Sequence, residues 1–166
     1  MGVAGVVTGG VGESFGTMGD IKIYIKKFGE VSRDELFDIA RLRQEVFFLE
    51  QRVECADLDD TDRLSAFLWA VCEGRMVGFL RIIPPGVAYA EASIGRVAVR
   101  REWRRRGIAS RMTAAALEYI AREWGGGVRI SSQEYVVPLY EQAGFEVVSE
   151  RYMEAGIPHY KMLKKG

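Results

Sequence analysis

The spacing of hydrophobic residues changes several times along the chain, and each change predicts a new secondary-structure element. Residues 21–26 alternate apolar and polar side chains, which is typical of a strand with one buried face. Two longer apolar runs flank the turn sequence Glu73–Gly74–Arg75, so they predict a β-hairpin. The strands predicted by these patterns are residues 21–26, 67–72, 76–83, 88–99, 128–132, 145–152 and 159–163.

Helices are predicted where apolar residues recur every three or four positions. Ser32 and Glu35 form a capping box, in which each side chain satisfies a backbone N–H of the other residue, and it opens a helix that runs through Phe47. The long helix from Gly107 to Trp124 carries one apolar stripe and ends at three glycines. A short helix around Tyr140 follows. Strands that alternate with helices in this way predict one α/β domain.

The domain is expected to cover residues 20–166, a length that supports a hydrophobic core without disulfides or a structural metal. Residues 1–19 carry seven glycines, so ordering them costs much entropy, and we expect a flexible N-terminal tail. No apolar run is long enough to span a bilayer, and no basic region precedes the apolar N-terminal stretch as it would in a signal peptide. We therefore expect a cytoplasmic protein, a monomer or homodimer, that does not bind membranes.

Charge is balanced overall but unevenly placed. Lys plus Arg and Asp plus Glu both number 23, and the resulting net charge of zero argues against a nucleic-acid-binding protein. Five arginines within residues 100–106 indicate a local anion site, and four aspartates within residues 57–62 form an acidic loop that we expect to attract a cationic substrate. That loop lacks the glycine and the distal glutamate of a calcium loop, and Cys55 and Cys72 with a single histidine do not make a zinc site. We expect no metal site and two buried, reduced thiols.

The segment Arg104–Ala109 combines cationic side chains with the start of a helix. An apolar run, residues 94–99, precedes it, and the predicted helix begins at Gly107. The first N–H groups of a helix have no acceptor within the helix, and the helix dipole adds positive charge there. Gly107 lets the backbone come close to an anion, and arginines keep their charge throughout the working pH range. The segment therefore predicts a phosphate site, although it has neither the Gly-Lys-Ser/Thr of a P-loop nor a dinucleotide-binding fingerprint.

This segment, Arg104–x–x–Gly107–x–Ala109 after a valine-rich strand, resembles the acetyl-CoA pyrophosphate loop of the GNAT family of N-acetyltransferases. A second motif, Tyr140 followed by Gly144 and Phe145, resembles that family's tyrosine-bearing helix in order and spacing. The segments that resemble the ElaA-type branch of the family are residues 42–51, 57–60, 94–97, Gln133 and 156–162. The resemblance implies an α/β, GNAT-like single domain with a mixed central sheet, in which a splayed parallel strand pair is flanked by helices.

The resemblance also implies which residues bind acetyl-CoA. In this family the strand before the pyrophosphate loop separates from its parallel neighbour, and its free backbone groups bond the pantetheine arm. Those groups would belong to Val97, Ala98 and Val99. The residues expected around the phosphates and the thioester are Arg104, Arg105, Arg106, Gly107, Ile108, Ala109, Ser110, Gln133 and Tyr140. Arg100 and Arg101 are expected to be plain surface residues.

Tyr140 is expected to protonate the thiolate that leaves when an amine attacks the thioester, because a phenol is normally protonated at neutral pH. The base that deprotonates the amine is left open between His159, Glu50, Glu91, Glu134 and a relay of water molecules. The residues expected to line the acceptor pocket are Arg43, Phe47, Glu50, Gln51 and His159. Within this set, Arg43 and Glu50 would either pair with each other or contact the substrate.

Together these features predict an N-acetyltransferase that moves an acetyl group from acetyl-CoA to an amine acceptor, a small molecule or a peptide, by direct attack in a ternary complex. An alternative is a non-catalytic acyl-CoA-binding sensor or partner protein on the same fold, because a fold does not establish an activity. A second alternative is a nucleic-acid-binding module that uses the clustered arginines and binds with a steep salt dependence. The zero net charge argues against this last function.

Overall fold

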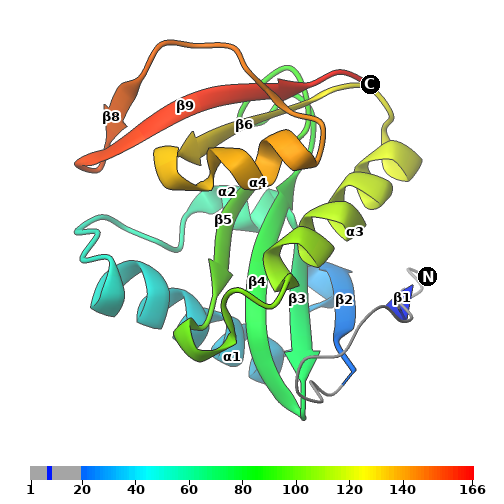
Figure 1. Cartoon of the computed structure of the whole chain (residues 1–166). Helices are drawn as coiled ribbons and strands as arrows, with labels where there is room; N and C mark the ends of the chain where they lie inside the picture. The colour runs from blue at the N-terminus through cyan, green and yellow to red at the C-terminus, as the bar shows by residue number, and fades with distance from the viewer. Residues whose placement is uncertain (1–6, 9–19) are drawn as a thin grey trace.

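Two antiparallel sheets that meet at one point organise the computed structural model of the chain, which describes residues 7–8 and 20–166 (Figure 1). The first sheet contains, in spatial order, β1 (Val7–Thr8), β2 (Lys22–Lys27), β3 (Ala66–Cys72), β4 (Arg75–Ile83) and β5 (Ser93–Val99). The second contains β6 (Val128–Gln133), β9 (Ile157–Lys164) and β7 (Glu146–Val147), with β8 (Tyr152–Glu154) also paired to β9. The helices are α1 (Arg33–Arg43), α2 (Asp60–Leu64), α3 (Ile108–Glu123) and α4 (Val137–Gln142). Shorter helical turns are η1 (Phe28–Glu30), η2 (Gln44–Glu50), η3 (Arg101–Trp103) and η4 (Glu134–Val136).

The two sheets are joined by a parallel bridge between Ala92 and Val128. Next to it, the N–H of Arg129 donates to the carbonyl of Ala92 over 2.9 Å. Beyond this bridge β5 and β6 run apart, and within residues 20–166 they form no further ladder with each other. The predicted mixed sheet with a splayed parallel strand pair is therefore confirmed.

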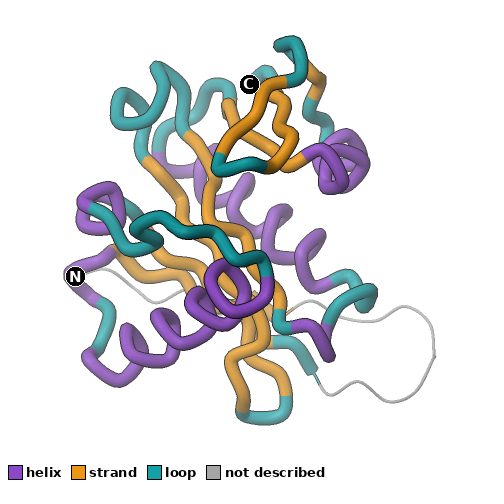
Figure 2. The backbone as a smooth tube through the Cα atoms, turned by 90° about the vertical axis from the view of Figure 1, so that its left-hand side faces the viewer, coloured by secondary structure: helices purple, strands orange, loops and turns teal. Residues whose placement is uncertain are grey.

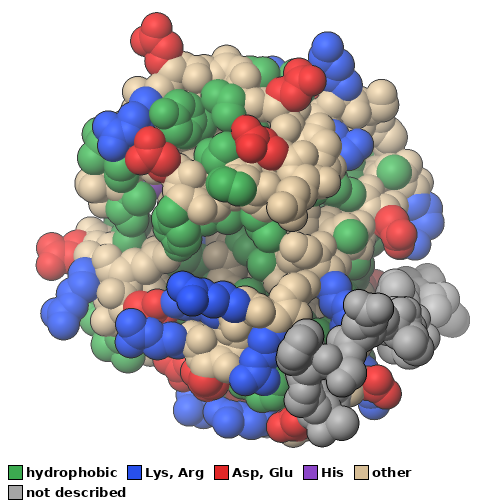
Figure 3. Space-filling model, viewed as in Figure 1, with side chains coloured by type: hydrophobic (Ala, Val, Ile, Leu, Met, Phe, Trp, Pro, Cys, Tyr) green, Lys and Arg blue, Asp and Glu red, His purple; other side chains and the backbone are tan. Residues whose placement is uncertain are grey.

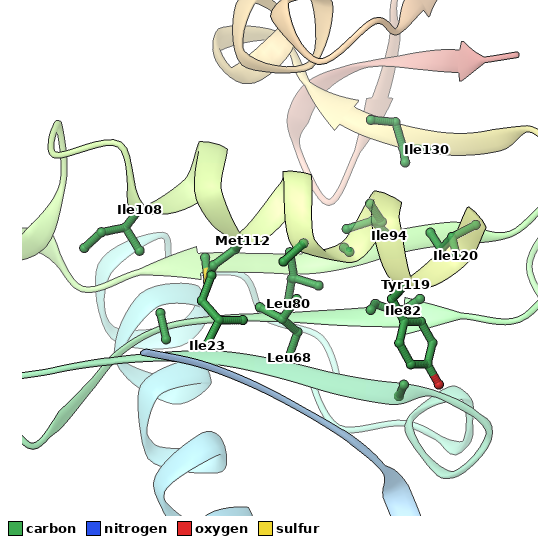
Figure 4. Close-up of a cluster of buried hydrophobic side chains, with 14 of the residues drawn as sticks. Ile23, Leu68, Leu80, Ile82, Ile94, Ile108, Met112, Tyr119, Ile120 and Ile130 are labelled. Carbon is green, nitrogen blue, oxygen red and sulfur yellow. The ribbon is translucent and has the colours of Figure 1, made fainter. Parts of the chain in front are cut away.

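Helix α3 covers one face of the first sheet, because its apolar stripe meets the apolar side of β3 and β4 (Figure 4). Leu68 on β3, Leu80 on β4 and Met112 on α3 are fully buried and lie together. Burying each such side chain stabilises the fold by about 1.5–3 kcal/mol. Gly78 on β4 permits the close approach of the helix, since a Cβ atom there would lie 2.9 Å from the Met112 sulfur.

Helix α1 covers the opposite face. Successive strand residues point to opposite faces, so Phe67 and Phe79, the sequence neighbours of the leucines that face α3, pack with Ile39 and Leu42 of α1. The rings of Phe67 and Phe79 meet edge to face, with centroids 5.2 Å apart. The first sheet consequently lies between the two helices (Figure 2).

The predicted elements are present, and the differences lie at their ends. The predicted first helix ends as α-helix at Arg43 and continues as a π-helical turn, η2. The strand predicted over residues 88–99 begins only at Ser93, after an irregular segment. The strand predicted over residues 145–152 is divided into β7 and β8, which pair with different parts of β9.

Within the predicted N-terminal tail, Val7–Thr8 pair with β2. The rest of that prediction, residues 1–6 and 9–19, lies outside the described residues. Among the helices of residues 20–166, none combines the length and apolar character that a membrane crossing requires.

Candidate functional site

Helix α3 begins without a side-chain cap. The first N–H groups of any helix lack an acceptor within the helix, and here no capping side chain accepts from them. Gly107 occupies the N-cap position in the left-handed conformation, with φ of 76°, and no side chain caps the helix. Its first turn also carries no acidic residue. Helix α1, by contrast, is closed by Ser32 and Glu35, whose reciprocal bonds to backbone N–H groups measure 3.1 and 2.8 Å. The start of α3 therefore suits an external anion such as a pyrophosphate.

The edge of β5 that faces β6 presents backbone groups to the gap between the sheets. The N–H of Arg100 donates to the Val77 carbonyl on β4 over 2.9 Å, so alternation turns the N–H and C=O of Val99 away from β4. The Val99 carbonyl accepts a bond of 2.9 Å from Nε of Arg104. A β-bulge precedes Val99, where Arg96 adopts φ of 52° and the pairing with β4 shifts register. The Val99 N–H thus faces the gap, while its carbonyl is already engaged.

A cavity of about 810 Å³ fills the gap between β5 and β6. Its lower wall is built from β5, η2 and the start of α3, and its upper wall from β6, α4 and the β8–β9 hairpin (Figure 1). Figure 3 shows the hollow, with Lys and Arg side chains gathered on its lower rim, where the segment after β5 lies. The predicted site residues that line this cavity are Phe47, Gln51, Val97, Ala98, Val99, Arg104, Arg105, Gly107, Ile108, Ala109, Ser110, Gln133, Tyr140 and His159.

Tyr140 on α4 lies in the upper wall with its ring packed edge to face on Phe145, at 5.6 Å between centroids. The residue is 5% exposed, yet its hydroxyl makes no hydrogen bond to any residue that the structure describes. Burial raises the pKa of this phenol, so it stays protonated throughout the physiological range. Its hydroxyl is therefore free to donate a hydrogen bond to a ligand in the cavity.

His159 on β9 also lies in the upper wall, buried and stacked on Tyr152 with 5.9 Å between ring centroids. Its Nδ1 is 2.7 Å from the carbonyl oxygen of Ile157, and its Nε2 is 3.2 Å from a carboxylate oxygen of Glu154. A carbonyl oxygen only accepts hydrogen bonds, so Nδ1 carries a hydrogen. Nε2, the other ring nitrogen, faces the Glu154 carboxylate.

Comparison with known proteins identifies the family to which this chain belongs. Residues 38–165 match the family model described as an acetyltransferase (GNAT) domain. The chain belongs to the GNAT family. A UPF0039 protein of Schizosaccharomyces pombe is 33% identical over 148 residues, which cover 87% of this chain and 97% of that protein.

Two crystal structures of similar proteins support the same GNAT assignment. Escherichia coli ElaA has a TM-score of 0.82 and 26% identity, over 87% of this chain and 99% of that one. An acyl-CoA N-acyltransferase from Pseudomonas aeruginosa has a TM-score of 0.81 and 28% identity, over 87% and 99% of the two chains. The predicted resemblance to the GNAT family and its ElaA-type branch is confirmed.

Arg43 lies outside the GNAT cavity. Its side chain is fully buried, and its guanidinium binds Asp57 over 2.7 Å and Asp62 over 2.8 Å. The prediction that Arg43 pairs with Glu50 or contacts the substrate is therefore wrong. The error arises because the two aspartates follow Arg43 by 14 and 19 residues, and helical spacing reveals no pairing at that distance.

The acidic loop is likewise neutralised by arginines. Arg81 binds Asp59 over 2.6 Å and Asp62 over 3.0 Å, while Arg96 binds Asp57 over 3.0 Å. Together with Arg43, these side chains form a cluster of three arginines and three aspartates beside the lower wall. The prediction that this loop attracts a cationic substrate is therefore wrong.

Glu50 does not line the cavity either. Arg104 binds its carboxylate with both terminal nitrogens, one at 2.8 Å, and these hydrogen bonds lower the pKa of Glu50. A carboxylate held in this way is a poor base, and Glu50 does not line the cavity in which an acceptor would bind, so the structure supports neither role predicted for Glu50. Arg106 also lies outside the cavity lining, with its guanidinium 5.0 Å from the centre of the Trp103 ring.

Arg100, Glu91 and Glu134 also form ion pairs. Arg100, expected at the surface, binds Glu45 and donates to the Met76 carbonyl over 2.8 Å. The two other candidate bases, Glu91 and Glu134, also pair with arginines and lie outside the cavity lining. Their partners are Arg129 and Arg151.

Gln51 and Gln133 link the two walls of the cavity. Nε2 of Gln133 donates to Oε1 of Gln51 over 3.3 Å, and Gln51 donates to the Tyr135 hydroxyl over 3.4 Å. The prediction of two buried thiols holds for Cys72, which is buried, and is wrong for Cys55, which is exposed and lines the cavity.

Two polar residues that line the upper wall, Ser131 and Glu154, were not predicted from the sequence, and neither was Tyr152, whose hydroxyl is hydrogen-bonded to Ser131. A sequence signal for them exists. The strands that flank Ala155–Gly156 pair through a two-residue turn, which sets Tyr152 opposite His159 and Glu154 opposite Ile157. Treating residues 145–152 as one continuous strand hid this register.

Proposed function

We propose that this protein is an acetyl-CoA-dependent N-acetyltransferase, in which an amine acceptor attacks the thioester directly in a ternary complex. One observation carries the proposal: a single cavity joins an uncapped helix start, a free strand edge, a buried phenol and an imidazole. The first two groups suit the phosphates and the pantetheine amides of acetyl-CoA. The last two suit the departing sulfur and the incoming amine.

The phosphates would bind the N–H groups of Ile108, Ala109 and Ser110, assisted by the charge of Arg105. Pantetheine would lie along β5 and receive the Val99 N–H. Val97, just after the bulge, would direct its N–H toward the thioester carbonyl, where a fixed donor stabilises the oxyanion of the tetrahedral intermediate. The acceptor would occupy the part of the cavity between Phe47 and His159.

Transfer of the acetyl group forms one bond and breaks another. The neutral amine nitrogen forms a bond to the acetyl carbon, and the carbon–sulfur bond then breaks. Tyr140 donates a hydrogen bond to the sulfur as negative charge develops there. Because burial raises the pKa of this phenol, the proton that ends on the sulfur is replaced on Tyr140 by one from the acylated nitrogen. No phenolate accumulates in this scheme.

Two measurements on the full chain test the proposal. Calorimetry should detect tight binding of acetyl-CoA, and thiol release should be faster with a panel of primary amines than with acetyl-CoA alone. The product should be identified as the N-acetyl amine by mass spectrometry. Binding of acetyl-CoA without amine-dependent thiol release would favour the acyl-CoA sensor, and absence of binding would contradict both functions.

A further inference from the structure

The upper wall of the cavity carries a continuous polar face. Gln133 on β6 and Tyr152 on β8 both stand opposite His159 in register, and Glu154 lies two residues from Tyr152 on the same side of β8. Ser131, two residues from Gln133, lies on this face as well. The pleat of three strands therefore collects an imidazole, a carboxylate and two hydroxyls on one surface, together with the ammonium of Lys161, which lies 4.9 Å from the centre of the Tyr152 ring.

Glu154 is bonded to two other members of this face. One carboxylate oxygen is 3.2 Å from Nε2 of His159 and accepts a hydrogen bond of 3.2 Å from Oγ of Ser131. Ser131 is in turn hydrogen-bonded to the Tyr152 hydroxyl. The remaining carboxylate oxygen of Glu154 makes no hydrogen bond to the described part of the chain, and the side chain is 55% exposed. A bound acceptor can therefore reach it.

Glu154 and Asp57, two carboxylates that line the cavity, differ in their ion-pair partners. Asp57 and Glu154 are the acidic residues among the described residues that line it. Asp57 is bound by Arg43 and Arg96, whereas Glu154 has His159 as its ion-pair partner and no arginine or lysine. An alkylammonium ion entering the cavity thus meets one carboxylate whose charge is not already neutralised by a permanent cation.

The backbone holds Glu154 in place at some cost. Ala155, which follows it and also lines the cavity, adopts φ of 49°, and Gly156 adopts φ of 76°. A left-handed conformation is unfavourable for alanine, and such strain is retained where the surrounding structure fixes it. Here the two-residue turn aims Glu154 back along β9 toward His159.

From this geometry we infer that Glu154, with His159 behind it, removes the proton that the acceptor amine must lose before it can attack. This inference rests on the proposed function. The ammonium transfers one proton to the free oxygen of Glu154, which leaves the amine neutral with its lone pair available and Glu154 as a neutral carboxylic acid. The exposed carboxylic acid then loses that proton to solvent, which restores the carboxylate. His159 contacts the other oxygen and holds the carboxylate in place.

Substitution combined with a matched pair of acceptors tests this role. Benzylamine is protonated at neutral pH, whereas phenylhydrazine has a similar shape and a terminal amine that is already neutral. In Glu154→Gln, kcat/KM for benzylamine should fall about 10²-fold or more, and that for phenylhydrazine by less than about threefold. Glu146→Gln, on exposed β7 and away from the cavity, is the control and should leave both rates unchanged.

Binding of acetyl-CoA by calorimetry checks that each variant is folded. Equal losses with the two acceptors would show that Glu154 has a structural role, and no loss with either would show that it has none; both results overturn the inference while leaving the proposed function intact. A parent protein that releases no thiol with either acceptor would instead contradict the proposed function, and this inference with it.

Discussion

At the scale of single residues, Tyr140 and Gly107 carry the clearest functional features. The Tyr140 residue is 5% exposed and lines the cavity, and its hydroxyl has no hydrogen-bond partner among the described residues. Gly107 has a conformation that side chains disfavour and open space where its Cβ would stand. A bound ligand would explain both features, because it could accept the hydrogen bond of the Tyr140 hydroxyl and occupy the open space beside Gly107.

Replacing Tyr140 by phenylalanine should lower kcat by about 10²–10⁴. The ring and its contact with Phe145 are kept, and no protein group loses a partner, so the fold and most of the acetyl-CoA affinity should be retained. Stopped-flow measurement of a single turnover isolates the chemical step. An unchanged single-turnover rate would remove Tyr140 from the mechanism.

Gly107→Asp should weaken acetyl-CoA binding at least tenfold, or about 1.4 kcal/mol. The carboxylate would place negative charge at the uncapped start of α3, and φ of 76° strains any side chain there. Gly74→Asp, at φ of 73° in the β3–β4 turn, imposes a similar strain away from the cavity and is the control. Equal affinity for acetyl-CoA in the two folded variants would contradict the phosphate site.

At the scale of elements, two ion pairs fasten η2 to the segment that follows β5. Glu45 binds Arg100, and Glu50 binds Arg104, whose Nε also holds the Val99 carbonyl. The Arg104 side chain lines the cavity and the Arg100 side chain does not. The Glu50–Arg104 pair therefore connects the proposed acceptor wall with the CoA loop.

Glu50→Gln should raise the KM for the amine by at most about fivefold, because partly exposed ion pairs contribute about 0.2–1 kcal/mol. Its kcat should stay within about threefold of the parent, since Glu50 touches no reacting atom in the proposed complex. Steady-state kinetics with varied amine separates the two constants, and Glu45→Gln should change neither. A loss of kcat of about 10²-fold would reinstate Glu50 as the base.

The elements that the sequence predicts well are those set by neighbouring residues. The Ser32–Glu35 capping box, the hairpin around Gly74 and the uncapped start of α3 all depend on contacts a few residues apart. The partners of Arg43 and Glu50 depend on how distant segments meet, and no local pattern specifies that. All the residues that the resemblance to the GNAT family predicts for CoA binding line the cavity except Arg106, but the resemblance said little about the upper wall, where Glu154 was missed.

At the scale of the whole molecule, the cluster of Arg43, Arg81, Arg96, Asp57, Asp59 and Asp62 ties α1, α2, β4 and β5 together. Burial alone would raise the pKa of Asp62, but hydrogen bonds from Arg43 and Arg81 outweigh this and lower it. A lowered pKa in the folded state means that the ionised carboxylate stabilises the fold above its unfolded pKa of about 3.9. That contribution is lost as the pH falls through the folded value.

Asp62→Asn should therefore lower the free energy of unfolding by about 3 kcal/mol near pH 7, because it leaves buried arginine charge without its partner. The difference from the parent should shrink as the pH falls below about 4, because Asp62 of the unfolded parent then binds a proton, and it should be smallest once the pH is below the lowered pKa of folded Asp62. Urea unfolding at a series of pH values measures both effects. Asp60→Asn, at an exposed neighbouring position, should stay within about 0.5 kcal/mol of the parent, and an Asp62 variant as stable as this control would contradict the role of the cluster.

The bridge between Ala92 and Val128 has one more consequence. Strands that part after one bridge have unpaired edges in the middle of a protein, and such edges attract other extended chains. In the proposed complex, pantetheine, with its two amide groups, would occupy that edge in the way that a short added strand would. The protein without CoA would then be more prone to associate through this edge than the protein with CoA bound.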